Sequence, residues 1–355
     1  MIRRKFLASA AAAAAATIAP LSFLSTAHAA SSLDPVLEIK KLRISSGPLT
    51  GGYLVAPAGR VNWYFTNLGL LPLISRLSPS DLALYIRPYL ELYLSNLQAN
   101  TGIMDFDLPA GPNGPIVPVA SDSDDSYAAT FLSLACRYTR ASGDMAWWDA
   151  RKSRLKDIAY GNLATTAKPT GLTSVFQSPR SSSNSLGYMM DNCEAYRGLR
   201  DFSAMLAEHG DGADANYYGS FATAMGAGID RELWMPAQSA FRASDGDAAA
   251  TTSFYPGATC QVFPQAFGVA EASAHFDAAW RYFNATAPNW QSGSLDPFPW
   301  AVLGFVAAVR GDWLSARAQL GSIDTLFVQN RGMVTINELG FYLRSVNVLS
   351  GRFAV

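Results

Sequence analysis

The sequence predicts an all-α protein made of consecutive helical hairpins, with only minor short β pieces. Apolar residues recur at helical spacing along most of the chain, whereas strand-like alternation is confined to short pieces near residues 36–55 and 239–255. Short and long connections also alternate along the chain, as a series of antiparallel helix pairs requires. The expected pairs cover residues 61–98, 124–166, 186–232, 262–286 and 298–327, with a single last helix at 336–350.

The short connections share a glycine–aspartate pair. This pair occurs at residues 143–144, 210–211 and 311–312, each time between two helical patterns. Glycine accepts the left-handed conformation that ends a helix, and the aspartate can cap the next helix. Consecutive hairpins therefore place the tight turns at one end of the molecule and the long connections at the other.

The long connections are rich in Gly, Pro, Ser and Asp and also carry several aromatic residues. They cover residues 99–123, 167–185, 234–260 and 287–297. Long loops in a compact fold are usually functional or disordered, and disordered linkers rarely contain many aromatic side chains. We therefore expect these loops to build a working face at one end of the helices.

This arrangement resembles the six-hairpin (α/α)6-toroid glycosidase superfamily, in which six inner helices surround a cleft built from such loops. The resemblance covers most of residues 60–350 as architecture and only short motifs as sequence. It implies that residues 30–355 form a single (α/α)6 toroid domain that binds a carbohydrate. It implies no cofactor and no metal ion.

The first 29 residues match a twin-arginine signal peptide. Residues 3–7 read RRKFL, which fits the R-R-x-F-L core of these signals, and an alanine-rich apolar stretch follows. Residues 27–29 read AHA, the small-x-small pattern at which signal peptidase cuts. The alternative is an ordinary secretory signal with a chance arginine pair. Either signal predicts a periplasmic or secreted protein.

The composition argues against several classes of partner. Three of the 27 basic residues lie in the first 29 residues, so 24 basic residues face 28 acidic ones afterwards, a net charge of −4. This balance does not suit nucleic acid, and no later segment is apolar enough to be an integral membrane span. The three cysteines (Cys136, Cys193 and Cys260) are widely spaced, and the two remaining histidines (His209 and His275) lack partners at metal-ligand spacing.

The first acidic cluster lies where the second hairpin begins. Asp122, Asp124 and Asp125 fall within four residues of one another. One or two acids are ordinary at a helix start, because they satisfy free N–H groups and the helix dipole. Three acids repel one another and need an arginine, a metal ion, a proton or a polyhydroxyl ligand. Capping alone and a ligand-facing role both remain open.

The second cluster lies in the first turns of the third hairpin. Asp191 and Glu194 are three residues apart, so they share one face of the helix. Each could instead pair with Arg197 or Arg200 within the same helix. If the helices form a ring, neighbouring inner helices bring both clusters to one cleft. Glu338, at the start of the last helix, also belongs to that face, although a first-turn acid is its simpler interpretation.

Acids from different helices around an aromatic cleft suit glycoside hydrolysis. One protonated carboxyl group donates to the leaving oxygen and one carboxylate activates water or attacks the sugar. Enzymes of the resembled superfamily are mostly inverting. The candidate acid–base pair combines Asp124 or Asp125 with Asp191 or Glu194. The candidate ligand-binding residues are Asp122, Tyr127, Tyr188, Tyr255, Trp290 and Trp300.

Other functions remain compatible with the sequence. Residues 122–126 also resemble the D-x-D-D-[ST] acid motif of terpenoid cyclases, although the chain is small for that family. A polysaccharide lyase would need a tyrosine base and a group that neutralises a uronate. A non-catalytic protein that binds glycans or assembles envelope polysaccharide would keep the cleft without the chemistry. The aspartate cluster could also hold Ca²⁺ or Mg²⁺, which prefer oxygen ligands.

Overall fold

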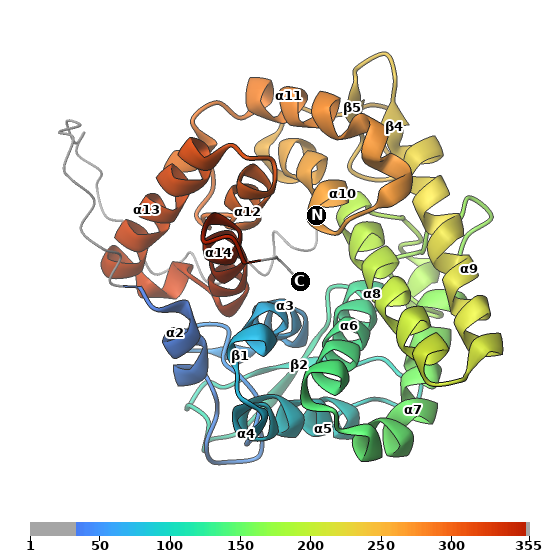
Figure 1. The fold of residues 1–355 in the computed structure, drawn as a ribbon, viewed down its shortest axis with the longest axis vertical. Coiled ribbons are helices and arrows are strands. Elements are labelled where there is room, and N and C mark those ends of the chain that lie inside the picture. Colours follow the sequence, from blue (N-terminus) through green and yellow to red (C-terminus); the bar gives the residue numbers. More distant parts are fainter. Residues whose placement is uncertain (1–32, 353–355) are drawn as a thin grey trace.

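The computed structural model describes residues 33–352, which form two concentric layers of helices (Figure 1). Each inner helix contacts the next, and the last one contacts the first, so the ring is closed. The prediction of an all-α toroid is confirmed. The inner helices are α3 (Trp63–Leu73), α6 (Asp125–Ser142), α8 (Met189–Glu208), α10 (Phe263–Ala266), α12 (Val302–Val309) and α14 (Ile336–Leu349).

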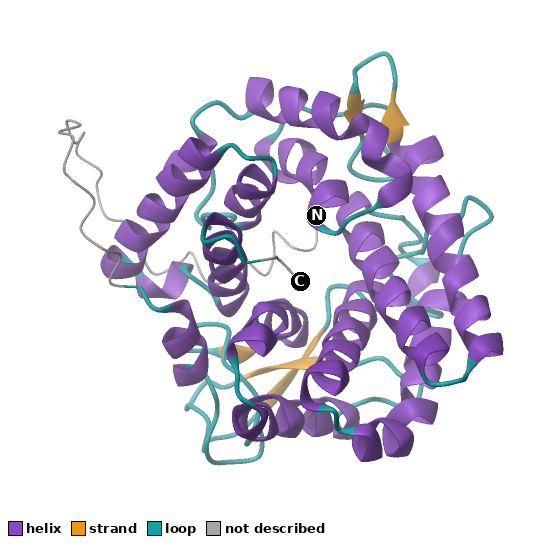
Figure 2. Cartoon of the chain, in the orientation of Figure 1, coloured by secondary structure: helices purple, strands orange, loops and turns teal. Residues whose placement is uncertain are grey.

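The outer layer runs antiparallel to the inner ring and covers it (Figure 2). One of its members, α4 (Pro79–Asp81), continues through a π-helical turn (Leu82–Ile86) into the next helix. The other outer helices are α2 (Pro35–Lys41), α5 (Arg87–Ser95), α7 (Met145–Ala159), α9 (Gly212–Gly228), α11 (Phe276–Thr286) and α13 (Trp313–Gln329).

Helix α2 replaces the strand-like structure expected at the start of residues 36–55, whereas Arg43 and Tyr53 in the same segment form an antiparallel β-bridge. The carboxylate of Asp34 accepts hydrogen bonds from the N–H groups of Val36 and Leu37 at 2.9 and 3.1 Å. Pro35 then occupies the first helical turn, where its missing N–H costs nothing. The resulting helix packs against α14. The N-terminal part of the described chain therefore supplies the outer partner of the last inner helix.

The glycine–aspartate pairs form tight turns at one face of the ring. Gly143, Gly210 and Gly311 have left-handed φ values of 68°, 84° and 78°. Asp144 and Asp312 cap the following helices, each accepting a hydrogen bond from the N–H three residues further on. The long connections consequently lie together at the opposite face, which we call the loop face.

Two small β-sheets lie at the loop face. A three-stranded antiparallel sheet has the order β1 (Arg60–Val61), β2 (Met104–Asp107) and β3 (Val117–Ala120). A second pair joins β4 (Trp234–Met235) to β5 (Ala240–Phe241), so strand structure in the predicted 239–255 piece is restricted to its start. The expected helical pair at 262–286 is also more broken than predicted, since Gly268 ends the first helix with φ 66°.

The core lies between the two helical layers. Helices α6 and α8 approach so closely that a Cβ atom on Gly198 would lie 2.4 Å from the carbonyl oxygen of Ala129. Cys136, Cys193 and Cys260 are buried free thiols. No helix within residues 33–352 is long and apolar enough to cross a membrane. The predicted signal peptide lies outside the described residues.

Candidate active site

A cavity opens at the loop face, where the N-terminal ends of the inner helices converge. Its volume is about 690 Å³ when the open space at the mouth is included. Most of its wall is aromatic or aliphatic, with a few polar groups. The lining residues are Asn62, Tyr64, Phe65, Leu68, Asp122, Glu194, Phe263, Phe298, Trp300, Val302, Asn337, Glu338 and Phe341.

Three carboxylates from three parts of the chain border this cavity. Glu194 lies on α8, and its Oε1 accepts a hydrogen bond of 2.5 Å from the hydroxyl of Tyr64. Glu338 lies on α14, and its Oε2 accepts one of 2.5 Å from the N–H of Ala301. Asp122 precedes α6 and is half-buried. The cavity therefore brings together acids from separate parts of the ring, among them Asp122 and Glu194, which the sequence predicted to share one cleft.

Glu338 has the properties of a proton donor, and the sequence analysis underrated it. Burial raises its pKa to about 7, the negative charge of Asp296 adds to this rise, and the Ala301 N–H opposes it. A first-turn glutamate after Thr335 would normally reach back to the N-terminus of its own helix in a capping box. Glu338 instead bonds to the neighbouring segment, which is what places it at the cavity.

The buried carboxylate of Asp105, for which the sequence predicted no role, fixes side chains in and behind the cavity wall. Its Oδ2 accepts hydrogen bonds of 2.6 and 2.8 Å from the side chains of Asn62 and Tyr127. Burial raises its pKa to about 7, although the Tyr127 hydrogen bond opposes the rise. Tyr127 is fully buried and its ring stacks on that of Tyr64 at 5.7 Å. Tyr127 thus supports the wall and does not meet the expectation of ligand stacking.

The predicted acids Asp125 and Asp191 lie behind the cavity wall, close to Glu194. Asp125 is completely buried, and its Oδ2 accepts a 3.0 Å hydrogen bond from the Thr173 hydroxyl. Burial raises its pKa well above the ordinary value, and the negative charges of Asp191 and Glu194 raise it further. Asp125 and Asp191 are not among the residues that line the cavity.

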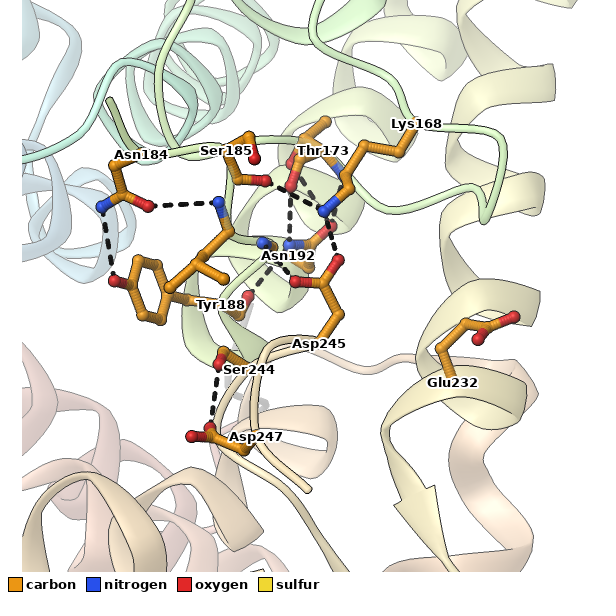
Figure 3. A network of polar contacts seen from close by, with 12 residues as sticks. Lys168, Thr173, Asn184, Ser185, Tyr188, Asn192, Glu232, Ser244, Asp245 and Asp247 are labelled. Carbon is orange, nitrogen blue, oxygen red and sulfur yellow. Dashed lines mark hydrogen bonds and ion pairs between the residues drawn. The ribbon is translucent and has the colours of Figure 1, made fainter. Parts of the chain in front are cut away.

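The loop between α7 and α8 is fixed beside Asp125 by a polar network (Figure 3). The side-chain oxygen of Asn192 accepts a 2.7 Å hydrogen bond from the N–H of Thr173. At the other side of the loop, Lys168 forms an ion pair with Asp245, which also accepts a 3.0 Å hydrogen bond from the N–H of Gly187. These contacts make the loop a rigid support for the carboxylate cluster.

Asp124 also anchors the loop between α7 and α8, through contacts with a different part of that loop. It forms an ion pair of 3.0 Å with Arg180 and accepts a 3.0 Å hydrogen bond from the N–H of Gln177. Burial raises the pKa of Asp124, while the Arg180 charge opposes that rise. The side chain is directed at the loop that it anchors and is not among those that line the cavity.

Trp300 is the predicted aromatic residue that the structure places in the cavity wall. Its φ of 53° is unusual for a bulky residue, and such strained conformations cluster at binding and catalytic sites. The ring of Tyr255 lies against it at 5.1 Å with a tilt of 33°. Together they form an aromatic rim.

The two other predicted aromatic residues lie elsewhere. Trp290 is 1% exposed and packs against Trp280 and Phe283 of α11, so it belongs to the core between the outer helices. Tyr188 is half-buried beside Asn184 and does not line the cavity. Within residues 33–352, no group of three or more His, Cys, Asp or Glu residues is arranged to hold a metal ion.

Comparison with known proteins identifies the fold. No protein-family model matches the chain, and no curated protein is similar to it in sequence. A phenylalanine-to-tyrosine variant of a glycosidase has a TM-score of 0.61 at 14% identity, with 90% of this chain and 96% of that one covered. A glutamate-to-alanine variant of a glycosidase in complex with glucose has a TM-score of 0.58 at 16% identity, with the same coverage.

A more distant structure has the same architecture. A rhamnosidase from Klebsiella oxytoca with rhamnose bound has a TM-score of 0.52 at 11% identity, with 85% of this chain and 66% of that one covered. At these identities the likeness concerns the fold. The chain has the fold of (α/α)6-toroid glycosidases, which confirms the predicted architecture.

Proposed function

We propose that the chain is a glycoside hydrolase that cleaves an oligo- or polysaccharide in the loop-face cavity. The observation that carries this proposal is the pairing of Glu338, whose pKa is about 7, with the carboxylate of Glu194 in the wall of one cavity. Trp300 and the other aromatic residues of the wall offer flat apolar surfaces for sugar rings. The glucose and rhamnose bound to enzymes of the same fold agree with a carbohydrate ligand.

Glu338 acts as the general acid in this proposal. A carboxyl group with a pKa near the working pH can hold a proton and still release it. It donates that proton to the glycosidic oxygen as the bond to the anomeric carbon breaks. Glu194, oriented by the Tyr64 hydroxyl, takes a proton from the water molecule that attacks the same carbon. Asp122, at the edge of the cavity, hydrogen-bonds the sugar hydroxyl groups.

The proposed stereochemical outcome is inversion. A water molecule must fit between the second carboxylate and the sugar, which requires a wide separation of the two acids. Glu194 and Glu338 come from different inner helices and lie in the same cavity. Following the anomer released first by proton NMR tests this directly, since a retained anomer contradicts the assignment of Glu194 as a base.

The decisive experiment screens the protein against bacterial and plant polysaccharides with a reducing-end assay. We expect Glu338→Gln and Glu194→Gln each to lower the rate by about 10²- to 10⁴-fold while the fold is retained. Glu232→Gln, a change outside the cavity wall, is the matched control and keeps full activity. Glycan binding without hydrolysis indicates a binding protein, and products with the ultraviolet absorbance of unsaturated uronates indicate a lyase; either result refutes the proposal.

We further propose that the enzyme works outside the cytoplasm. The support is the twin-arginine pattern of residues 3–7 and the AHA site at residues 27–29. Replacing both arginines of the pair with lysine is expected to retain the full-length precursor in the cytoplasm. Cell fractionation and the mass of the exported chain test this. Unchanged export of the double-lysine variant points to the ordinary secretory route.

A further inference from the structure

A second cavity lies at the opposite, tight-turn end of the inner ring. It is lined by the middle and C-terminal parts of the inner helices and has a volume of about 730 Å³ when its mouth is included. Val309, which is 44% exposed, marks the opening to solvent. Glu194 borders both cavities. The central channel of the ring is thus divided near this residue.

The second cavity is strongly basic. Arg137 of α6, Arg197 of α8 and Arg344 of α14 all line it. One nearby acid, Asp201, forms ion pairs with Arg137 and Arg197. These two charges hold the pKa of Asp201 below its ordinary value, so it is ionised. With Asp201 and Glu194 both counted as negative, three guanidinium groups leave an excess of one positive charge.

Arg344 is the group that lacks a counterion. It is 7% exposed, and its buried Nε has no hydrogen-bond partner among residues 33–352. It lies over the rings of Phe341 and Phe305 at 5.1 and 5.7 Å. Burial and the charges of the other two arginines lower its pKa to about 9, so it remains protonated near neutral pH.

Further donors in the cavity are also unsatisfied. The buried Nη1 of Arg137 and Nε of Arg197 have no hydrogen-bond partner among residues 33–352. A buried charge without a partner is strongly destabilising, and proteins rarely retain one without a use. Guanidinium groups present paired N–H donors that match the oxygen atoms of carboxylate, sulfate and phosphate.

We propose that this cavity is a binding site for an oxyanion, which Arg344 contacts directly and Arg137 and Arg197 help to hold. The ligand class is a carboxylate, sulfate or phosphate group, either free or attached to a larger molecule. The site lies on the other side of Glu194 from the proposed active site. The inference stands independently of the proposed hydrolase activity, because it rests on the charge and the unsatisfied donors of a separate cavity.

The test measures binding of sulfate, inorganic phosphate and acetate by titration calorimetry and by the shift in melting temperature. Sodium chloride at equal ionic strength corrects for screening. Only saturable binding counts, because sulfate also stabilises proteins non-specifically at high concentration. We expect at least one anion to bind saturably. Arg344→Met is expected to weaken that binding by about tenfold or more, as loss of one charge-assisted contact implies.

Two further variants make the result decisive. Arg197→Gln, which replaces a half-exposed side chain (41% exposed), is also expected to weaken binding and provides the answer if Arg344→Met does not fold. Arg154→Gln replaces an arginine of α7 that pairs with Asp157 outside the cavity, and it is expected to bind as the natural protein does. Absence of saturable binding, or unchanged binding in both cavity variants, overturns the proposal.

An anion attached to a sugar is distinguished by a separate comparison. If an acidic monosaccharide binds much more tightly than acetate or sulfate, the site recognises the anion as part of a larger ligand. Equal affinities indicate a site for the free anion. Loss of hydrolysis in Glu338→Gln, whose side chain lines the proposed active site and not this cavity, leaves these binding measurements unaffected, so failure of the hydrolase proposal and failure of this one are separable.

Discussion

Replacing Glu338 with glutamine is expected to remove a pH-dependent loss of stability. The pKa of Glu338 rises from 4.5 to about 7 in the folded protein. At 1.36 kcal/mol per pKa unit, keeping this carboxylate ionised in the fold costs about 3 kcal/mol. Below pH 4.5 the group is protonated in both the folded and the unfolded chain, so the cost is absent. It grows as the pH rises towards 7 and is complete above 7.

Glutamine cannot ionise, so the variant escapes this cost. We therefore expect the free energy of unfolding of Glu338→Gln, relative to the natural protein, to increase by about 3 kcal/mol between pH 4.5 and pH 8. Asp105 also has a raised pKa, but it is present in both proteins and its contribution cancels. The variant therefore gains stability relative to the natural protein as the pH rises from 4.5 to 8.

Urea unfolding followed by tryptophan fluorescence at pH 4.5, 6 and 8 measures this difference. Glu232→Gln, which removes a glutamate outside the cavity, is measured at the same pH values as the control. A constant difference for Glu338→Gln would refute the assignment of a raised pKa. It would also remove the main argument for Glu338 as the general acid.

Four other substitutions test the fold and the support of the site. Gly143→Ala is expected to cost about 1 kcal/mol of stability, because φ is 68° and the site is otherwise open. Gly198→Ala is expected to cost about 3 kcal/mol, because the added methyl group clashes between α6 and α8. Equal losses of stability for the two variants in urea unfolding contradict this. Arg180→Met leaves buried Asp124 unpaired and is expected to cost about 3 kcal/mol at pH 8, but less at pH 4; a pH-independent loss contradicts the ion pair. Asp105→Ala leaves buried donors unsatisfied and is expected to cost about 3 kcal/mol in thermal denaturation; a neutral effect contradicts the network.

The architecture was predictable because its signals are local. Helical periodicity and the glycine–aspartate pairs act within a few residues of one another, and these features identified the hairpins. Helix α2 was missed because it has only seven residues and its stability comes from packing on α14, about 300 residues away along the chain. The β2–β3 hairpin was missed because the strands lie in a loop whose composition predicts turns.

The site was predictable only in part, because carboxylates are assigned by their surroundings. The sequence correctly brought Asp125, Asp191 and Glu194 together, since they begin neighbouring inner helices. It could not show that Asp124 pairs with an arginine 56 residues away. Nor could it show that the Glu338 carboxylate accepts a hydrogen bond from Ala301 instead of completing a capping box in its own helix. Both arrangements have the same local sequence pattern.

The closure of the ring by α14 also governs when the proposed active site can form during synthesis of the chain. Until residues 336–349 leave the ribosome, the inner helices form an open arc whose two ends, at α3 and α12, expose apolar faces. The same last helix carries Glu338. A partly made chain therefore lacks both the closed core and the proposed acid, and its open ends can join those of another chain. Premature termination is consequently expected to yield aggregates rather than weakly active fragments.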